Sequence, residues 1–93
     1  MLKVNFFATL RYITGGKTVE IDLDHGCTAK DVLNAIIVQY PALKKELINE
    51  DGRLLGHVHF FINGRDIQFT ESDLETCIEL GDIINVFPAV GGG

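Results

Sequence analysis

Residues 57–64 read HVHFFING, an alternating segment that runs directly into a turn. The apolar positions on one side of this segment are Val58, Phe60 and Ile62. Alternation with a period of two is typical of a strand with one buried face, and it places Phe61 on the opposite face. Asn63-Gly64 is the strongest short hairpin signal in the chain, so a brief strand is expected at residues 65–69. The segment therefore predicts a β-hairpin with an aromatic ring on its outer face.

Similar patterns occur towards both ends of the chain. Residues 2–8 and 19–23 alternate between apolar and polar side chains, as expected for two strands. The turn signal Thr14-Gly15-Gly16 lies between them and predicts that they pair as a hairpin. An apolar run at residues 83–87 predicts a last strand, which Pro88 stops.

An amphipathic helix is expected between the first two strands and the central hairpin. Thr28 is a suitable N-cap, and Asp31 follows three residues later as in a capping box. Apolar residues then recur at helical spacing until Pro41, which ends the helix. Because proline fits the first position of a helix, Pro41 can also open a short second helix.

The predicted order of elements is strand, strand, helix, strand, short strand, strand. This order favours an α+β fold: a mixed sheet of about five strands packed on one main helix, with a short second helix. We expect one domain over residues 1–88 and a flexible glycine tail at residues 89–93, because no repeat, linker or second domain is evident.

Composition narrows the function classes. The chain has 93 residues and a net charge of −5, without a run of Lys or Arg, so a nucleic-acid partner is not expected. No apolar run approaches the length that spans a bilayer, so no membrane association is expected. Two isolated cysteines, Cys27 and Cys77, favour reduced thiols and a cytoplasmic location, with a disulfide as the less favoured alternative.

The sequence lacks the motifs of a self-contained enzyme. Ser72 is not surrounded by a nucleophile elbow, and no phosphate-binding loop is present. His57 and His59 share one strand face and could ligate a metal, but no third ligand is placed nearby. A solvated strand face is therefore the favoured interpretation. We expect a chain that is non-catalytic alone and binds neither a metal nor a cofactor.

The last residues, Ala89-Val90-Gly91-Gly92-Gly93, suggest a different kind of chemistry. Glycine has no β-carbon, so this tail could enter a narrow channel of a partner and bring its carboxylate close to a nucleotide. A carboxylate must be activated, for example as an acyl-adenylate, before sulfur or an amine can attack it. Since the chain has no nucleotide site, another enzyme would supply the activation. A frayed or artificially added end remains the alternative.

The outward faces of three strands carry one phenylalanine each. By alternation, Phe7, Phe61 and Phe87 point away from the helix. If they cluster, they form an apolar patch beside the root of the tail, and such patches mark partner sites. Coverage of one or two of these rings by loops is the open alternative.

Three segments resemble the MoaD family, the small subunit of molybdopterin synthase, within the MoaD/ThiS ubiquitin-like sulfur-carrier superfamily. They are FFATLR at residues 6–11, INGR at residues 62–65 and GDIINVFPAVGGG at residues 81–93. The resemblance covers nearly the whole chain and implies a ubiquitin-like β-grasp fold. It also implies that an E1-like adenylating enzyme of the MoeB type uses ATP and magnesium to activate the terminal glycine. A sulfur-donating enzyme then yields a thiocarboxylate, which a large subunit of the MoaE type uses to build molybdopterin.

The resemblance also assigns roles to residues. Phe7 and Phe87 match the apolar contact surface of the family, and we add Phe61 from the alternation and Arg11 from the opening motif. The segment that would insert into partner active sites comprises Pro88, Ala89, Val90, Gly91, Gly92 and Gly93. The family usually ends in two glycines, and this chain ends in three. We therefore name Gly93 as the preferred reacting residue and Gly92 as the alternative after trimming.

Four functions remain open at this point. The first is a sulfur carrier for molybdenum cofactor biosynthesis. The second is a ubiquitin-like modifier that is conjugated to lysines through its C-terminus. The third is a sulfur donor for tRNA thiolation or thiamine. The fourth is a purely structural interaction module, for which the tail would be dispensable.

Overall fold

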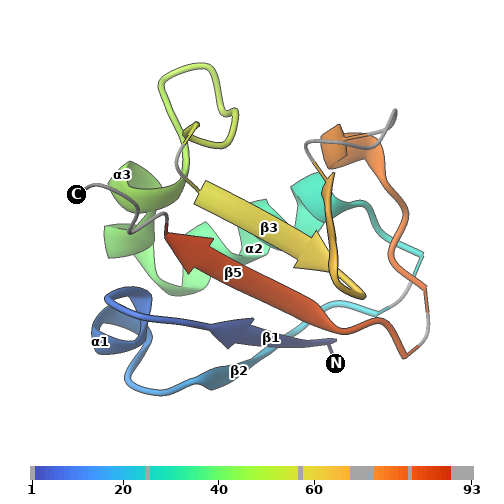
Figure 1. The fold of residues 1–93 in the computed structure, drawn as a ribbon, viewed down its shortest axis with the longest axis horizontal. Helices are drawn as coiled ribbons and strands as arrows, with labels where there is room; N and C mark the ends of the chain where they lie inside the picture. Colours follow the sequence, from blue (N-terminus) through green and yellow to red (C-terminus); the bar gives the residue numbers. More distant parts are fainter. Residues whose placement is uncertain (1, 25, 57, 68–72, 80, 89–93) are drawn as a thin grey trace.

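The protein, described here from a computed structural model, is a five-stranded sheet with its helices packed on one face (Figure 1). The structure describes residues 2–24, 26–56, 58–67, 73–79 and 81–88. The strands are β1 (Leu2–Phe6), β2 (Thr18–Ile21), β3 (Val58–Ile62), β4 (Arg65–Asp66) and β5 (Ile84–Pro88). Their order across the sheet is β2-β1-β5-β3-β4. The predicted α+β grasp is confirmed.

The sheet is mixed because its central pair is parallel. β1 and β5 run in the same direction, with Phe6 opposite Val86. β1 pairs with β2, β3 with β5, and β3 with β4, all antiparallel. The first and last strands of the chain are therefore neighbours in the middle of the sheet.

The main helix, α2 (Ala29–Gln39), begins at the predicted capping box. The Asp31 backbone N–H donates to Thr28 Oγ1 over 3.2 Å, and the Thr28 N–H donates to Asp31 Oδ2 over 3.0 Å. Pro41 ends α2 and opens a 3₁₀ turn, Pro41–Leu43, which leads into α3 (Lys44–Leu47). The predicted second helix is thus confirmed. None of the described helices has the length and apolar character required to cross a membrane.

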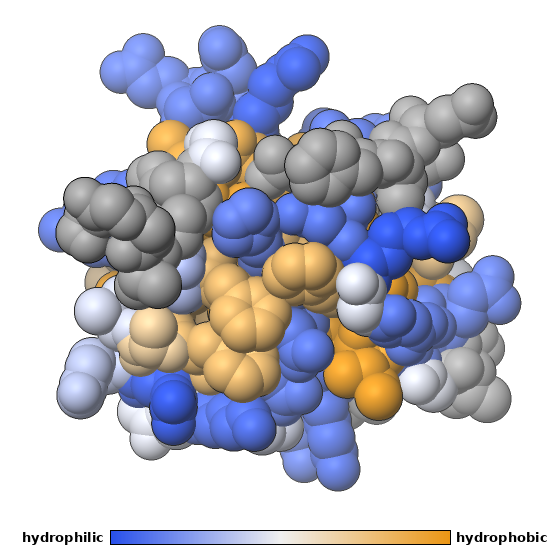
Figure 2. All heavy atoms as spheres, in the orientation of Figure 1, coloured by the Kyte–Doolittle hydropathy of each residue, from blue (hydrophilic) through white to orange (hydrophobic). Residues whose placement is uncertain are grey.

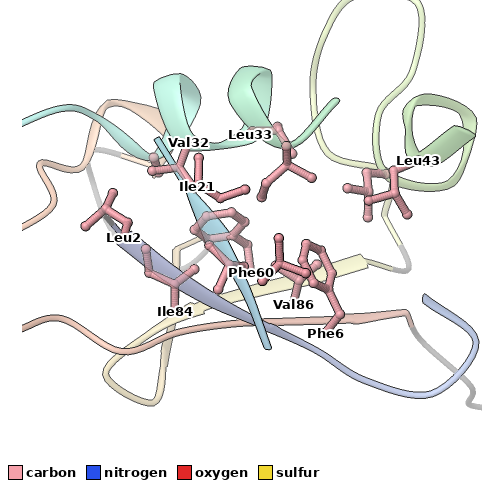
Figure 3. Packing of buried hydrophobic residues seen from close by; sticks show 14 of the residues in the cluster. Leu2, Phe6, Ile21, Val32, Leu33, Leu43, Phe60, Ile84 and Val86 are labelled. Atoms are coloured by element: carbon pink, nitrogen blue, oxygen red, sulfur yellow. The ribbon is translucent and has the colours of Figure 1, made fainter. Parts of the chain in front are cut away.

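The core lies between α2 and one face of the sheet (Figure 3). Val32 and Leu33 point from α2 towards the sheet, whose side chains Phe60 and Ile84 face them (Figure 3). The fully enclosed side chains, each with 0% exposure, are Val4, Phe6, Ala29, Val32, Ile36, Leu43, Leu47, Val58, Phe60, Ile84 and Val86. The alternating residues of β1, β3 and β5 supply one wall of this core, as their sequence pattern predicts.

The connection between β1 and β2 differs from the prediction. The strand expected at residues 2–8 ends at Phe6, and Ala8 adopts a positive φ of 55°. A short helix, α1 (Leu10–Thr14), follows before the turn at Gly15, and Leu10 packs into the core at 2% exposure. The two strands still pair as predicted, but through a helical turn that the sequence analysis missed.

The turn at Asn63-Gly64 is confirmed by its backbone and its hydrogen bonds. Both residues have positive φ, 54° and 83°. The Asn63 side chain donates to Asp82 Oδ1 over 2.8 Å and accepts from the Ile83 N–H over 2.9 Å, which fixes the start of β5 against the hairpin. β4 comprises Arg65–Asp66, and residues 68 and 69 of the predicted strand lie outside the described residues.

Candidate functional site

Three phenylalanine rings lie together on the sheet face that the helices leave open. The Phe7 and Phe87 rings stack with centroids 4.2 Å apart, and Phe61 meets Phe87 edge-on at 5.3 Å. All three side chains are partly exposed. Figure 2 shows apolar atoms gathered near the centre of this face, among hydrophilic residues. The predicted patch is therefore confirmed, and we call Phe7, Phe61 and Phe87 the aromatic patch.

Strand register brings these rings together. The Phe7 N–H donates to the Val86 carbonyl over 3.2 Å, which extends the β1–β5 pairing by one residue beyond β1. Phe87 lies opposite His59 on β3, and Phe61 is two residues further along β3. Side chains at these positions share one face of the sheet, so the three rings meet although 80 residues separate the first from the last.

A polar row crosses the sheet beside the aromatic patch. Thr18 Oγ1 donates to Asn5 Oδ1 over 2.8 Å, and Asn5 Nδ2 donates to Asn85 Oδ1 over 2.9 Å. These contacts link β2, β1 and β5 through their outward side chains. The row satisfies polar groups at the edge of the patch and holds the strands that carry the rings in register.

Two ionisable side chains contact the aromatic patch, and the sequence analysis assigned neither of them to it. Lys17 Nζ lies 5.2 Å from the Phe7 ring centroid, within the range of a cation–π contact. The His59 ring stacks on Phe61 at 6.0 Å, and its Nδ1 lies 2.8 Å from Asp66 Oδ2. Asp66 is 7% exposed and His59 is 40% exposed. A buried carboxylate thus holds one edge of a solvent-facing imidazole.

The structure separates the predicted site residues into groups. The rings of Phe7, Phe61 and Phe87 form the patch, and Pro88 ends β5 opposite Val58. Arg11 is exposed on α1, outside this group of rings. The tail residues Ala89, Val90, Gly91, Gly92 and Gly93 lie outside the described residues, so their roles stay predictions.

The structure gives His59 a carboxylate partner, whereas His57, the other histidine considered as a metal ligand, lies outside the described residues. Within the described ranges, no group of three or more His, Cys, Asp or Glu side chains is arranged to hold a metal ion.

Both cysteines are free thiols, Cys27 partly buried and Cys77 exposed. Burial raises the pKa of the Cys27 thiol, and the nearby Asp31 carboxylate raises it further. Cys27 is therefore a poor nucleophile at neutral pH.

Known proteins resemble this chain over nearly its full length. Residues 4–93 match the ThiS family. The small archaeal modifier protein 3 of Haloferax volcanii is 37% identical over 92 residues, 99% of this chain and 98% of that protein. The solution structure of the small archaeal modifier protein 1 of Methanosarcina acetivorans superimposes with a TM-score of 0.81 at 34% identity, covering 98% and 94% of the two chains.

A third similar structure contains a second protein. It is the crystal structure of the Amycolatopsis orientalis BexX/CysO complex, in which the matching chain has a TM-score of 0.80 and 29% identity. The match covers 98% of both chains.

Proposed function

The chain belongs to the ThiS family of ubiquitin-like sulfur carriers, and from this premise we propose that it carries sulfur as a thiocarboxylate on its terminal glycine. An E1-like adenylating enzyme activates Gly93, or Gly92 after trimming, and the aromatic patch is the surface on which that enzyme docks. ATP and magnesium are bound by the activating enzyme and not by this chain.

The observation that carries the proposal is the position of the aromatic patch beside the end of β5. Phe87 belongs to the patch, Pro88 ends the strand, and the five residues 89–93 follow. A fully extended chain spans at most about 3.5 Å per residue, so these residues reach about 17 Å from Pro88. A partner seated on the rings can therefore receive the tail in its own active site without moving the domain.

Three chemical steps follow. The glycine carboxylate attacks the α-phosphorus of ATP, forming an acyl-adenylate and releasing pyrophosphate. The terminal sulfur of a donor persulfide then attacks the acyl carbon and AMP leaves. A second donor thiol cleaves the resulting S–S bond, which leaves the thiocarboxylate on this chain and a disulfide on the donor. This chain supplies the carboxylate and the docking surface, and the partners supply the nucleotide site and the sulfur.

The destination of the activated tail has two candidates. The first is molybdopterin synthesis, in which a large subunit of the MoaE type accepts the sulfur. This candidate rests on the MoaD-like motifs at residues 6–11 and 81–93. The second is conjugation to protein amines, which the names of two small archaeal modifier proteins, 37% and 33% identical to this chain, favour. Both begin with the same acyl-adenylate, and tRNA thiolation would use the same thiocarboxylate.

Intact-mass spectrometry tests the shared step. We expect that incubation with the E1-like enzyme from the same genome, ATP, magnesium and a sulfur source adds the mass difference between sulfur and oxygen. Deletion of Gly92 and Gly93 should abolish the shift while the circular dichroism spectrum stays unchanged, since the tail follows the last strand. A wild-type chain that binds the ATP-loaded enzyme and yet shows no change in mass would contradict the proposal.

Purification from the native host separates the two destinations. A copurifying large subunit and restored molybdopterin synthesis in a deletion strain would support the first candidate. A ladder of isopeptide-linked proteins, lost when Gly92 and Gly93 are deleted, would support the second.

A further inference from the structure

The aromatic patch lies in a row whose two ends have opposite polarity. Lys17 contacts Phe7, Phe7 stacks on Phe87, and Phe87 lies opposite His59, which is bound to Asp66. This order follows the strands from one edge of the sheet to the other. The lysine end carries a positive charge, and the histidine end contains a carboxylate.

Asp66 fixes the proton on the His59 ring. An ionised carboxylate only accepts hydrogen bonds, so the 2.8 Å contact places the proton of the neutral ring on Nδ1. In this neutral form of the ring, the other nitrogen, Nε2, is an acceptor, and the side chain is 40% exposed. Because the Asp66 side chain is 7% exposed and the ring also stacks on Phe61, the orientation of this acceptor is held from two sides.

At the other end, Lys17 acts as a cationic donor. Its ammonium group lies over the Phe7 ring, and the residue itself is exposed to solvent. Further from the rings, Lys3 and Glu20 lie directly opposite each other on β1 and β2, so their charges offset one another. Among the residues that the structure describes, the polarity next to the aromatic patch is therefore set by Lys17 on one side and by the His59–Asp66 pair on the other.

We propose that Lys17 and His59 set the direction in which a partner lies across the aromatic patch. The partner's groove would place a carboxylate opposite Lys17 and a hydrogen-bond donor opposite His59 Nε2. This inference rests on the proposed function, and the occupant is the adenylating enzyme. If the partner bound in the reverse orientation, its carboxylate would face the acceptor of His59 and its hydrogen-bond donor would face Lys17. The polar ends therefore select the orientation that leads the tail from Pro88 towards the nucleotide. His59 is a specificity-determining contact, and Asp66 is a positioning residue that acts through it.

The histidine end is tested with the full-length chain and the E1-like enzyme from the same genome. His59→Phe keeps a ring beside Phe61 and removes the acceptor, and it should weaken binding about tenfold in calorimetry, as expected for one lost hydrogen bond at an interface. Asp66→Asn should weaken binding to a similar degree, because an amide can donate to Nδ1 and move the ring proton to Nε2. ¹⁵N NMR of the imidazole would report that change of tautomer directly.

A double variant distinguishes positioning from a general loss of structure. If Asp66 acts through His59, the combined His59→Phe and Asp66→Asn variant should bind no more weakly than His59→Phe alone. Urea denaturation of each variant checks that the fold persists. Additive losses, or a His59→Phe variant that binds within about twofold of wild type, would overturn the role of this pair.

The lysine end is tested by rates and salt. Lys17→Met should slow association about threefold at low salt and flatten its salt dependence, because a charge at the edge of an interface acts mainly on the association rate. Lys44→Met, on α3 at the helical side, is the matched control and should leave both unchanged. Equal effects of the two substitutions would refute a directed lysine contact.

Failure of this inference can be told from failure of the proposed function. If the wild-type chain gains the sulfur-for-oxygen mass and Phe87→Ala weakens binding, while His59→Phe and Lys17→Met do not, only the polarity of the row is wrong. If the wild-type chain neither binds the enzyme nor changes mass, the proposed function itself is wrong.

Discussion

Phe60 and Phe61 are neighbours in β3, yet they lie on opposite faces of the sheet and meet different surroundings. Phe60 is 0% exposed among the core residues beneath α2, whereas Phe61 is partly exposed and contacts the rings of Phe87 and His59. The covered face is closed by the chain's own helices, and none of the described helices packs on the open face. The same residue type therefore stabilises the fold on one face and stays partly exposed to solvent on the other.

The largest effect should come from the covered face. Phe60→Ala removes a fully enclosed ring and should lower the free energy of unfolding by about 3–5 kcal/mol. Phe61→Ala is the matched control and should cost only about 0.5–1.5 kcal/mol, the range for an aromatic pair. Urea denaturation measures both. Equal losses would mean that the open face contributes to the fold as much as the core does.

The next effect is a loss of binding affinity. Phe87 contacts both other rings of the aromatic patch, so Phe87→Ala should weaken binding of the adenylating enzyme by about 2 kcal/mol or more. Calorimetry at constant salt checks this value. Because Val86 and not Phe87 faces the core, the free energy of unfolding should fall only by the two lost ring pairs, about 1–3 kcal/mol. Unchanged affinity would remove the aromatic patch from the docking surface.

A smaller effect is expected on the helical side of the sheet. Thr28→Ala removes the side-chain acceptor of the α2 capping box and should cost about 1 kcal/mol of stability. Affinity for the adenylating enzyme should not change, since α2 lies behind the sheet (Figure 1). Parallel denaturation and binding measurements test the separation. A loss of affinity would show that the two faces are coupled.

The smallest effect is chemical. Iodoacetamide at neutral pH should label exposed Cys77 well before Cys27, and peptide mass spectrometry gives the ratio.

Burial, and then Asp31, raises the pKa of Cys27, so the folded state holds this proton more tightly than the unfolded state does. The associated stability is complete below the thiol's unfolded pKa and is lost as pH rises through the folded value. Cys27→Ala should therefore reduce the loss of stability in the alkaline range.

Much of the covered face could be predicted from local patterns. Thr28 and Asp31 lie three residues apart, so their reciprocal cap is visible in the sequence, and alternation alone assigned Phe60 and Phe61 to opposite faces. Alternation also placed Phe7, Phe61 and Phe87 on one side. Strand order then brought these rings together, which no local pattern specifies.

The missed features depend on register or on too few residues. α1 has five residues, one buried side chain and no side-chain cap, so its helical period is too short to recognise. The His59–Asp66 contact requires β4 to pair with β3 so that Asp66 lies opposite Phe61. β4 has two residues, which is too short for alternation to show which way Asp66 points.

The parallel pairing of β1 with β5 also bears on how the molecule is made. Synthesis on the ribosome releases β1 and β2 first, then α2, then β3 and β4, and β5 emerges last. Until it does, β1 and β3 lack the strand that lies between them, and the core lacks Ile84 and Val86. A truncated product therefore cannot close its sheet. The last strand thus completes both the sheet and the core, so the residues next to the glycine tail are among those on which the finished domain depends.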